Sequence, residues 1–211
     1  MNWTEQRSSF RSGADAVAGM LEDVSDFTIP GLGIWDLSGL AGHFVRAIRT
    51  PITYLQEPIP DGEPLPSAAA YVAGYLRWRG EDADAADDAV AARGADELSV
   101  DGPHPAHLIR LEAGRLDVML AQENPARLVP TRFGPMRLDH YLRTRSMELI
   151  VHGLDIAKAV GHDWSPPSAL LGDVLTLLME VAIDLGSAEE LLLVLSGRIN
   201  PTDTDVLPVL R

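Results

Sequence analysis

One stretch of the sequence decides the fold: Arg145-Ser-Met-Glu148-Leu-Ile-Val-His152-Gly-Leu-Asp155. Glu148 and His152 are four residues apart, so in a helix their side chains lie on one face, one turn from each other. At roughly 100° per residue, one stripe of this helix collects the polar residues Arg137, Tyr141, Arg145, Glu148, His152 and Asp155. Because apolar residues flank the stripe on both sides, we predict that it faces the protein core.

The opposite face of the same helix carries Asp139, Arg143, Ser146 and Gly153, and we predict that this face meets solvent. Burying an unpaired charge costs several kcal/mol. The inward-facing carboxylate and imidazole must therefore be paired, hydrogen-bonded or bound to a metal.

Helical periodicity and proline or glycine breaks divide the chain into helices. The expected helices cover residues 4–24, 35–49, 67–93, 105–122, 136–160, a segment after 168, and 187–197. Thr50-Pro51 should end the second helix, and residues 51–66, with five prolines, should form a long loop. Ser67 is the expected N-cap of the third helix.

No series of alternating strands interrupts these helices; only residues 127–135 look extended. We therefore predict an all-α fold, an antiparallel four-helix bundle with additional C-terminal helices. The expected organisation is a single domain over residues 1–211, with a bundle core at about 1–163 and a helical extension at about 164–211.

Composition narrows the classes of function. The 211 residues carry a formal net charge of −14, which argues against nucleic acid and against an anionic membrane surface. The acidic run Glu81–Asp88 is expected to be solvated. The sequence has no cysteine, which excludes disulfides and thiolate ligands, and no apolar run long enough to span a membrane. With no signal peptide at the N-terminus, we expect a cytoplasmic protein.

His43 lies at the edge of the apolar side of the second predicted helix. Alone, such a histidine is more often a hydrogen-bonded core residue, and Glu148 with His152 could be a buried pair. However, metal sites in bundles are built from ligand-type side chains that two helices present inward. Two histidines and a glutamate suit zinc and leave a fourth position to water or substrate. We therefore predict a metal site at His43, Glu148 and His152.

The remaining histidines are weaker candidates. His104, His107 and His162 should face solvent, and His140 lies at the margin of the polar stripe.

Two motifs resemble those of a known family. The first is Trp35-Asp-Leu-Ser-Gly-Leu40-Ala-Gly-His43. The second is Phe133-Gly-Pro-Met136 followed by Arg145-x-x-Glu148-x-x-x-His152-Gly-x-Asp155-x-Ala157-x-Ala159-x-Gly161. Their residues, order and spacing resemble the mycothiol-dependent maleylpyruvate isomerase metal-binding domain, within the DinB-like superfamily.

This resemblance implies a DinB-like helical bundle with one divalent metal, usually zinc, whose ligands map onto His43, Glu148 and His152. It also implies a low-molecular-weight thiol, mycothiol in actinobacteria, whose sulfur approaches the metal. We therefore expect a mycothiol-dependent S-transferase or isomerase, in which a metal-activated thiolate attacks a small electrophile. The expected partners are small molecules, and a homodimer is compatible with the sequence.

Two further residues of the stripe are candidates for roles at the site. Asp155 could orient a ligand histidine. Arg145 could neutralise Glu148 or hold an anionic substrate. Two other functions stay open: a non-catalytic metal-binding or ligand-sensing bundle, and a structural bundle whose stripe is satisfied internally. Metal content and thiol-dependent turnover discriminate among the three.

Overall fold

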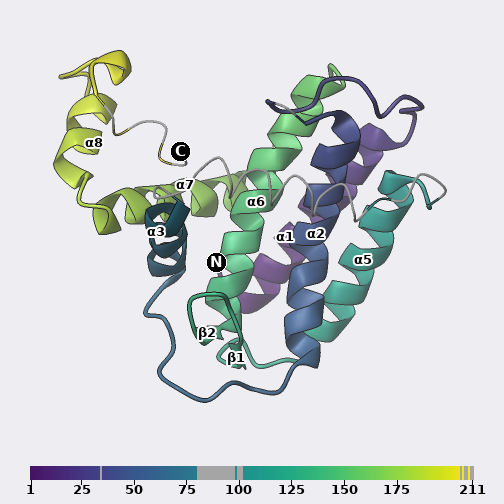
Figure 1. The fold of residues 1–211 in the computed structure, drawn as a ribbon, viewed down its shortest axis with the longest axis horizontal. Helices are drawn as coiled ribbons and strands as arrows, with labels where there is room; N and C mark the ends of the chain where they lie inside the picture. Colours follow the sequence, from purple (N-terminus) through teal and green to yellow (C-terminus); the bar gives the residue numbers. More distant parts are fainter. Residues whose placement is uncertain (34, 80–97, 99–101, 205, 207–208, 210–211) are drawn as a thin grey trace.

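The chain folds as a succession of helices with one very short antiparallel ladder (Figure 1). The computed structural model describes residues 1–211 except 34, 80–97, 99–101, 205, 207–208 and 210–211. The elements are α1 (Trp3–Leu21), α2 (Leu37–Gln56), α3 (Ala68–Arg79), α5 (Pro105–Leu120), β1 (Leu128–Val129), β2 (Met136–Arg137), α6 (Leu138–Ala159), α7 (Ser168–Asp184), α8 (Ala188–Leu195) and the 3-10 helix η1 (Pro201–Asp203). The predicted all-α class is confirmed.

Helices α1, α2, α5 and α6 pack on one another as a four-helix bundle, as predicted (Figure 1). Gln6 near the start of α1 donates to the carbonyl of Asp139 near the start of α6, at 2.9 Å. Arg7, also near the start of α1, pairs with Asp117 near the end of α5, at 2.9 Å. Hence α1 is parallel to α6 and antiparallel to α5. The connection from α2 to α5 carries α3, which packs on α7 and α6 beside the bundle.

Side chains at the starts of several helices cap the first backbone N–H groups. Asn2 and Glu5 form a reciprocal capping box at the start of α1. The side chains of Asp36 and Ser67 each accept a hydrogen bond from the backbone N–H three residues later, at 2.8 and 3.0 Å. Gly161, just after α6, takes the positive φ of 67° that favours glycine. The N-cap predicted at Ser67 is confirmed.

Helix α2 continues through Pro51 to Gln56, so the helix end predicted at Thr50-Pro51 was wrong. Proline has no N–H, which removes one hydrogen bond from a helix interior. The apolar face nevertheless continues past it, through Ile48, Ile52 and Leu55, all buried. The hydroxyl of Thr50 also donates to the carbonyl of Arg46, at 2.8 Å. Burial of this face therefore outweighs the local cost of the proline, and the proline-rich loop begins only after Gln56.

The face of α6 opposite the polar stripe is covered by α1 and α7, so the solvent exposure predicted for it was wrong. Ser146 and Gly153 are buried. Arg143 pairs with Asp173 at 3.1 Å and also with Glu180, both on α7. Helix α6 is therefore enclosed on two sides, because the segment after it folds back against the bundle.

Some expectations fall outside the described residues. The third helix is described as far as Arg79, and the acidic run Glu81–Asp88 lies outside the described part. Among the helices that are described, none combines the length and the apolar character needed to cross a membrane.

Candidate metal centre

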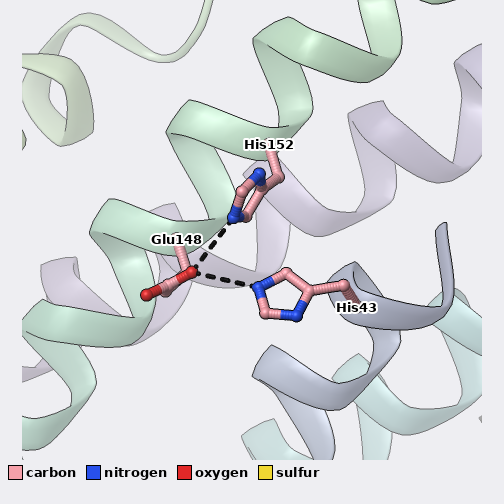
Figure 2. A group of neighbouring side chains, drawn as sticks. All are labelled: His43, Glu148 and His152. Atoms are coloured by element: carbon pink, nitrogen blue, oxygen red, sulfur yellow. Dashed lines mark hydrogen bonds and ion pairs between the residues drawn. The ribbon is translucent and has the colours of Figure 1, made fainter. Parts of the chain in front are cut away.

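Helices α2 and α6 bring together the three side chains that the sequence singled out (Figure 2). His43 projects from the second turn of α2, and Glu148 and His152 project toward it from successive turns of α6. One ligand atom from each residue lies within 4.8 Å of the other two. Residues 105 positions apart in the sequence thus meet at one point in the bundle.

The distances from the Glu148 oxygen to the two histidine nitrogens suit a tetrahedral metal. His43 Nε2 lies 3.4 Å from Glu148 Oε2, and His152 Nε2 lies 3.2 Å from the same oxygen. Around zinc, with bonds of about 2.0–2.1 Å, neighbouring ligand atoms of a tetrahedron are about 3.3–3.4 Å apart. The residues therefore fit a divalent cation in both chemistry and separation.

Two different contacts hold the histidine rings. His152 Nδ1 lies 3.1 Å from Asp155 Oδ2, so this carboxylate directs Nε2 toward Glu148. His43 Nδ1 is buried and has no hydrogen-bond partner in the described part of the chain. The His43 ring instead packs on Trp35 and on the edge of His152, with ring centroids 5.1 and 4.7 Å apart.

The three groups hold their protons very differently in the metal-free protein. Burial lowers the pKa of His43 and keeps it neutral. Burial would raise the pKa of Glu148, but hydrogen bonds from His152 and His43 and the charge of Arg145 hold it well below its usual range. Burial likewise opposes a charge on His152, but hydrogen bonds to Asp155 and Glu148 raise its pKa to about 9. At neutral pH His152 therefore carries a proton, which a cation would have to displace in order to bind at its Nε2.

Arg145 lies between this triad and a group of tyrosines. Its Nη2 is 3.8 Å from Glu148 Oε1, and its guanidinium carbon is 5.1 Å from the centroid of the Tyr141 ring. The Tyr141 ring in turn lies 5.2 Å from that of Tyr54 on α2 and 6.1 Å from that of Tyr71 on α3.

The sequence stripe contained Tyr141 but missed Tyr54 and Tyr71. Tyr54 follows His43 by eleven residues, three turns of helix, so both side chains lie on the same face of α2. The signal was therefore present, and it was lost because the helix was expected to end at Pro51. Tyr71 had no comparable signal, because nothing in the sequence predicts where α3 packs.

The other histidines lie outside the triad. His104, His107 and His162 are exposed, as predicted, and His140 is half-buried. His104 also has a structural role, because its Nδ1 accepts a hydrogen bond from the backbone N–H of Ala106 in the first turn of α5, at 3.3 Å.

The comparison with family models covers the part of the chain that carries this site. A family model described as "Mycothiol maleylpyruvate isomerase N-terminal domain" matches residues 6–157. The match runs from α1 nearly to the end of α6 and includes His43, Glu148 and His152. The chain belongs to this family. In this member of the mycothiol maleylpyruvate isomerase N-terminal domain family, the triad lies within the four-helix bundle, and α7 and α8 follow the matched residues. No curated protein and no solved structure matches the chain.

Proposed function

We propose that this protein is a metal-dependent enzyme that uses a low-molecular-weight thiol, mycothiol, as an S-transferase or an isomerase. The observation that carries the proposal is the meeting of His43, Glu148 and His152, whose ligand atoms all lie within 4.8 Å of one another. Membership in a family described by mycothiol and maleylpyruvate isomerase supports the choice of thiol.

In this proposal His43, Glu148 and His152 hold the metal, which is zinc. Three protein ligands leave a fourth tetrahedral position to water or substrate, as in catalytic rather than structural zinc sites. The sequence contains no cysteine, so any thiol that reacts here comes from another molecule. The bound metal would lower the pKa of a thiol at this position, so that the thiolate is available near neutral pH.

The chain's own residues prepare the site for this chemistry. Asp155 fixes the ring of His152 so that its Nε2 faces Glu148. The ring would therefore not need to reorient when the metal binds. Arg145 places a positive charge beside Glu148, where it favours anionic species. Trp35 packs on His43 and keeps that ring in place.

Two reactions fit this arrangement. In a transfer, the sulfur lone pair forms a C–S bond, the bond to the leaving group breaks with its electrons, and the thiol proton passes to solvent. In an isomerisation, the sulfur adds to a C=C bond, the resulting single bond rotates, and elimination restores the double bond and the thiolate. Neither reaction needs an oxidant or a reductant.

Metal content tests the first half of the proposal. Protein purified without chelator should hold about one divalent metal per chain, and His43→Ala or His152→Ala should lose it while far-UV circular dichroism stays helical. His162→Ala, which removes an exposed histidine, is the matched control and should keep its metal. A variant of His43 or His152 with full occupancy would remove that residue from the ligand set.

Thiol binding tests the second half. Cobalt-substituted protein should change its absorption spectrum on addition of mycothiol, because sulfur coordination alters the cobalt bands, and the metal-free protein should bind no mycothiol in calorimetry. Metal binding without any response to millimolar thiol would instead favour a non-catalytic metal-binding bundle. If the protein bound neither metal nor thiol, the polar stripe would have only a structural role.

A further inference from the structure

Two arginines on α6, two residues apart, use their donors in opposite ways. Arg143 directs Nε at Asp173 and both terminal nitrogens at Glu180, so its guanidinium is fully engaged in ion pairs with α7. Arg145 forms one hydrogen bond to a described residue, from Nε to Thr144 Oγ1 at 3.2 Å. A guanidinium carries five N–H donors in a fixed fork. Most donors of Arg145 therefore have no acceptor within the described part of the protein.

Glu148 does not occupy these donors. Its Oε2 faces both histidines, and its Oε1 lies 3.8 Å from Arg145 Nη2, beyond hydrogen-bond distance. An arginine that served only to neutralise a carboxylate would be expected to form the two-pronged contact that Arg143 makes with Glu180, in which two guanidinium nitrogens each donate to one carboxylate oxygen. The fork of Arg145 therefore remains open to another acceptor.

The tyrosines beside Arg145 add donors that are also unused. The hydroxyls of Tyr54, Tyr71 and Tyr141 form no hydrogen bond with any described residue. Burial raises the pKa of Tyr71 and of Tyr141, so both phenols stay protonated and can donate at neutral pH.

We propose that Arg145, with Tyr54 and Tyr141, binds a carboxylate group of a small molecule beside the His43–Glu148–His152 triad. A planar guanidinium and neighbouring hydroxyl donors match the two oxygens of a carboxylate. The Arg145 side chain retains 14% of its surface, so a ligand oxygen can reach it. The position, one helical turn from Glu148, would hold such a molecule next to the metal. As a statement about substrate, this proposal rests on the proposed function, and it makes that substrate an acid.

The binding step is tested without metal, so that it does not depend on the proposed chemistry. In nitrogen-15-labelled, metal-free protein, acetate should move the Arg145 side-chain NMR signal with saturation in the millimolar range. The signal is assigned by its loss in Arg145→Lys. Arg143 is the matched control, and its signal should stay still. Tyr54→Phe removes only a hydroxyl and should weaken acetate binding several-fold.

Three outcomes would overturn the proposal: an Arg145 signal unmoved by about 100 mM acetate, an equal shift of Arg143, or saturation by inorganic phosphate but not by acetate. If acetate binds while no divalent metal does, the carboxylate site stands and the proposed function falls. If metal and thiol bind but acetate does not move the Arg145 signal, the proposed function stands and the carboxylate site falls.

A pair of thiols then shows which molecule brings the carboxylate. Cobalt-loaded protein is titrated with 3-mercaptopropionate and with 3-mercapto-1-propanol, which differ in the acid group. Tighter binding of the acid, abolished in Arg145→Lys, would assign the carboxylate to the thiol. Equal binding of the two thiols, with acetate still shifting Arg145 in the presence of the alcohol, would assign it to the electrophile.

Discussion

His152 and Asp155 form a fixed pair on one turn of α6, with Nδ1 of the ring 3.1 Å from Oδ2 of the carboxylate. An imidazole has two nitrogens, and a hydrogen bond at one decides which tautomer the other presents. The pair therefore leaves Nε2 as the atom that faces Glu148 and His43. The orientation of the His152 ring is therefore set within α6, independently of any bound metal.

Replacing this carboxylate should weaken the metal site without unfolding the bundle. We expect Asp155→Asn to raise the Kd for zinc by about 10- to 100-fold, the usual effect of losing a carboxylate behind a ligand histidine. A competition titration with a chelating dye measures it. Asp163→Asn, at an exposed position after the helix, is the control. An unchanged affinity in Asp155→Asn would mean that packing alone orients His152.

Metal affinity should rise with pH between about 7 and 9. His152, with a pKa of about 9, carries a proton in the metal-free protein throughout this range, and that proton must leave when the metal binds. Affinity should therefore increase by up to about tenfold per pH unit and level off above about pH 9. Calorimetry at pH 7 in two buffers of different ionisation enthalpy should show about one proton released per metal. Release of none would contradict a protonated His152.

The metal-free protein should lose stability over part of the same range. The folded-state pKa of His152, about 9, lies above its unfolded value of about 6.5. Its contribution is therefore fully present below pH 6.5 and is lost as the pH rises through 9, by at most about 3 kcal/mol. Urea unfolding with chelator at several pH values measures this slope. His152→Gln should flatten it, and an equally steep slope in that variant would assign the effect elsewhere.

A methyl group at Gly153 should strain the helix next to His152. A Cβ there would lie 2.5 Å from the Trp164 ring and 3.0 Å from Val17, whereas a Cβ at Gly172, in α7, would meet nothing within 4 Å. We expect Gly153→Ala to lower the free energy of unfolding by about 1–3 kcal/mol. Gly172→Ala should raise it by about 0.5–1 kcal/mol through helix propensity. Thermal or urea unfolding compares them, and a stabilised Gly153→Ala would show that Trp164 moves aside freely.

The sequence predicted the candidate site better than its surroundings. The residues His43, Glu148 and His152 followed from spacing within helices, because a period of 3.6 residues fixes which side chains share a face. Their meeting across two helices followed from the bundle class. The same reasoning placed Tyr141 and Arg145 in the stripe. It did not show that Arg145 would be left with open donors, since that depends on the distance to each neighbour.

The wrong expectations have a common physical cause. Pro51 breaks a helix by local rules, but burial of the apolar face on both sides of it outweighs the lost hydrogen bond. Ser146 and Gly153 are typical of an exposed face by composition, but small residues also allow close packing. Both are buried, and Gly153 lies against Val17 of α1 and Trp164 of the connection to α7. In each case tertiary packing overrode a local preference, and a single sequence does not reveal the strength of that packing.

The division of the triad between α2 and α6 also sets an order of events during synthesis. A chain grows from its N-terminus, so His43 leaves the ribosome long before Glu148 and His152 exist. A nascent chain that ends before α6 contains His43 but neither Glu148 nor His152, so it lacks the complete triad. Binding of the proposed cation by all three residues would therefore follow the docking of α6 against α2, and a retained ion would show that this assembly is complete.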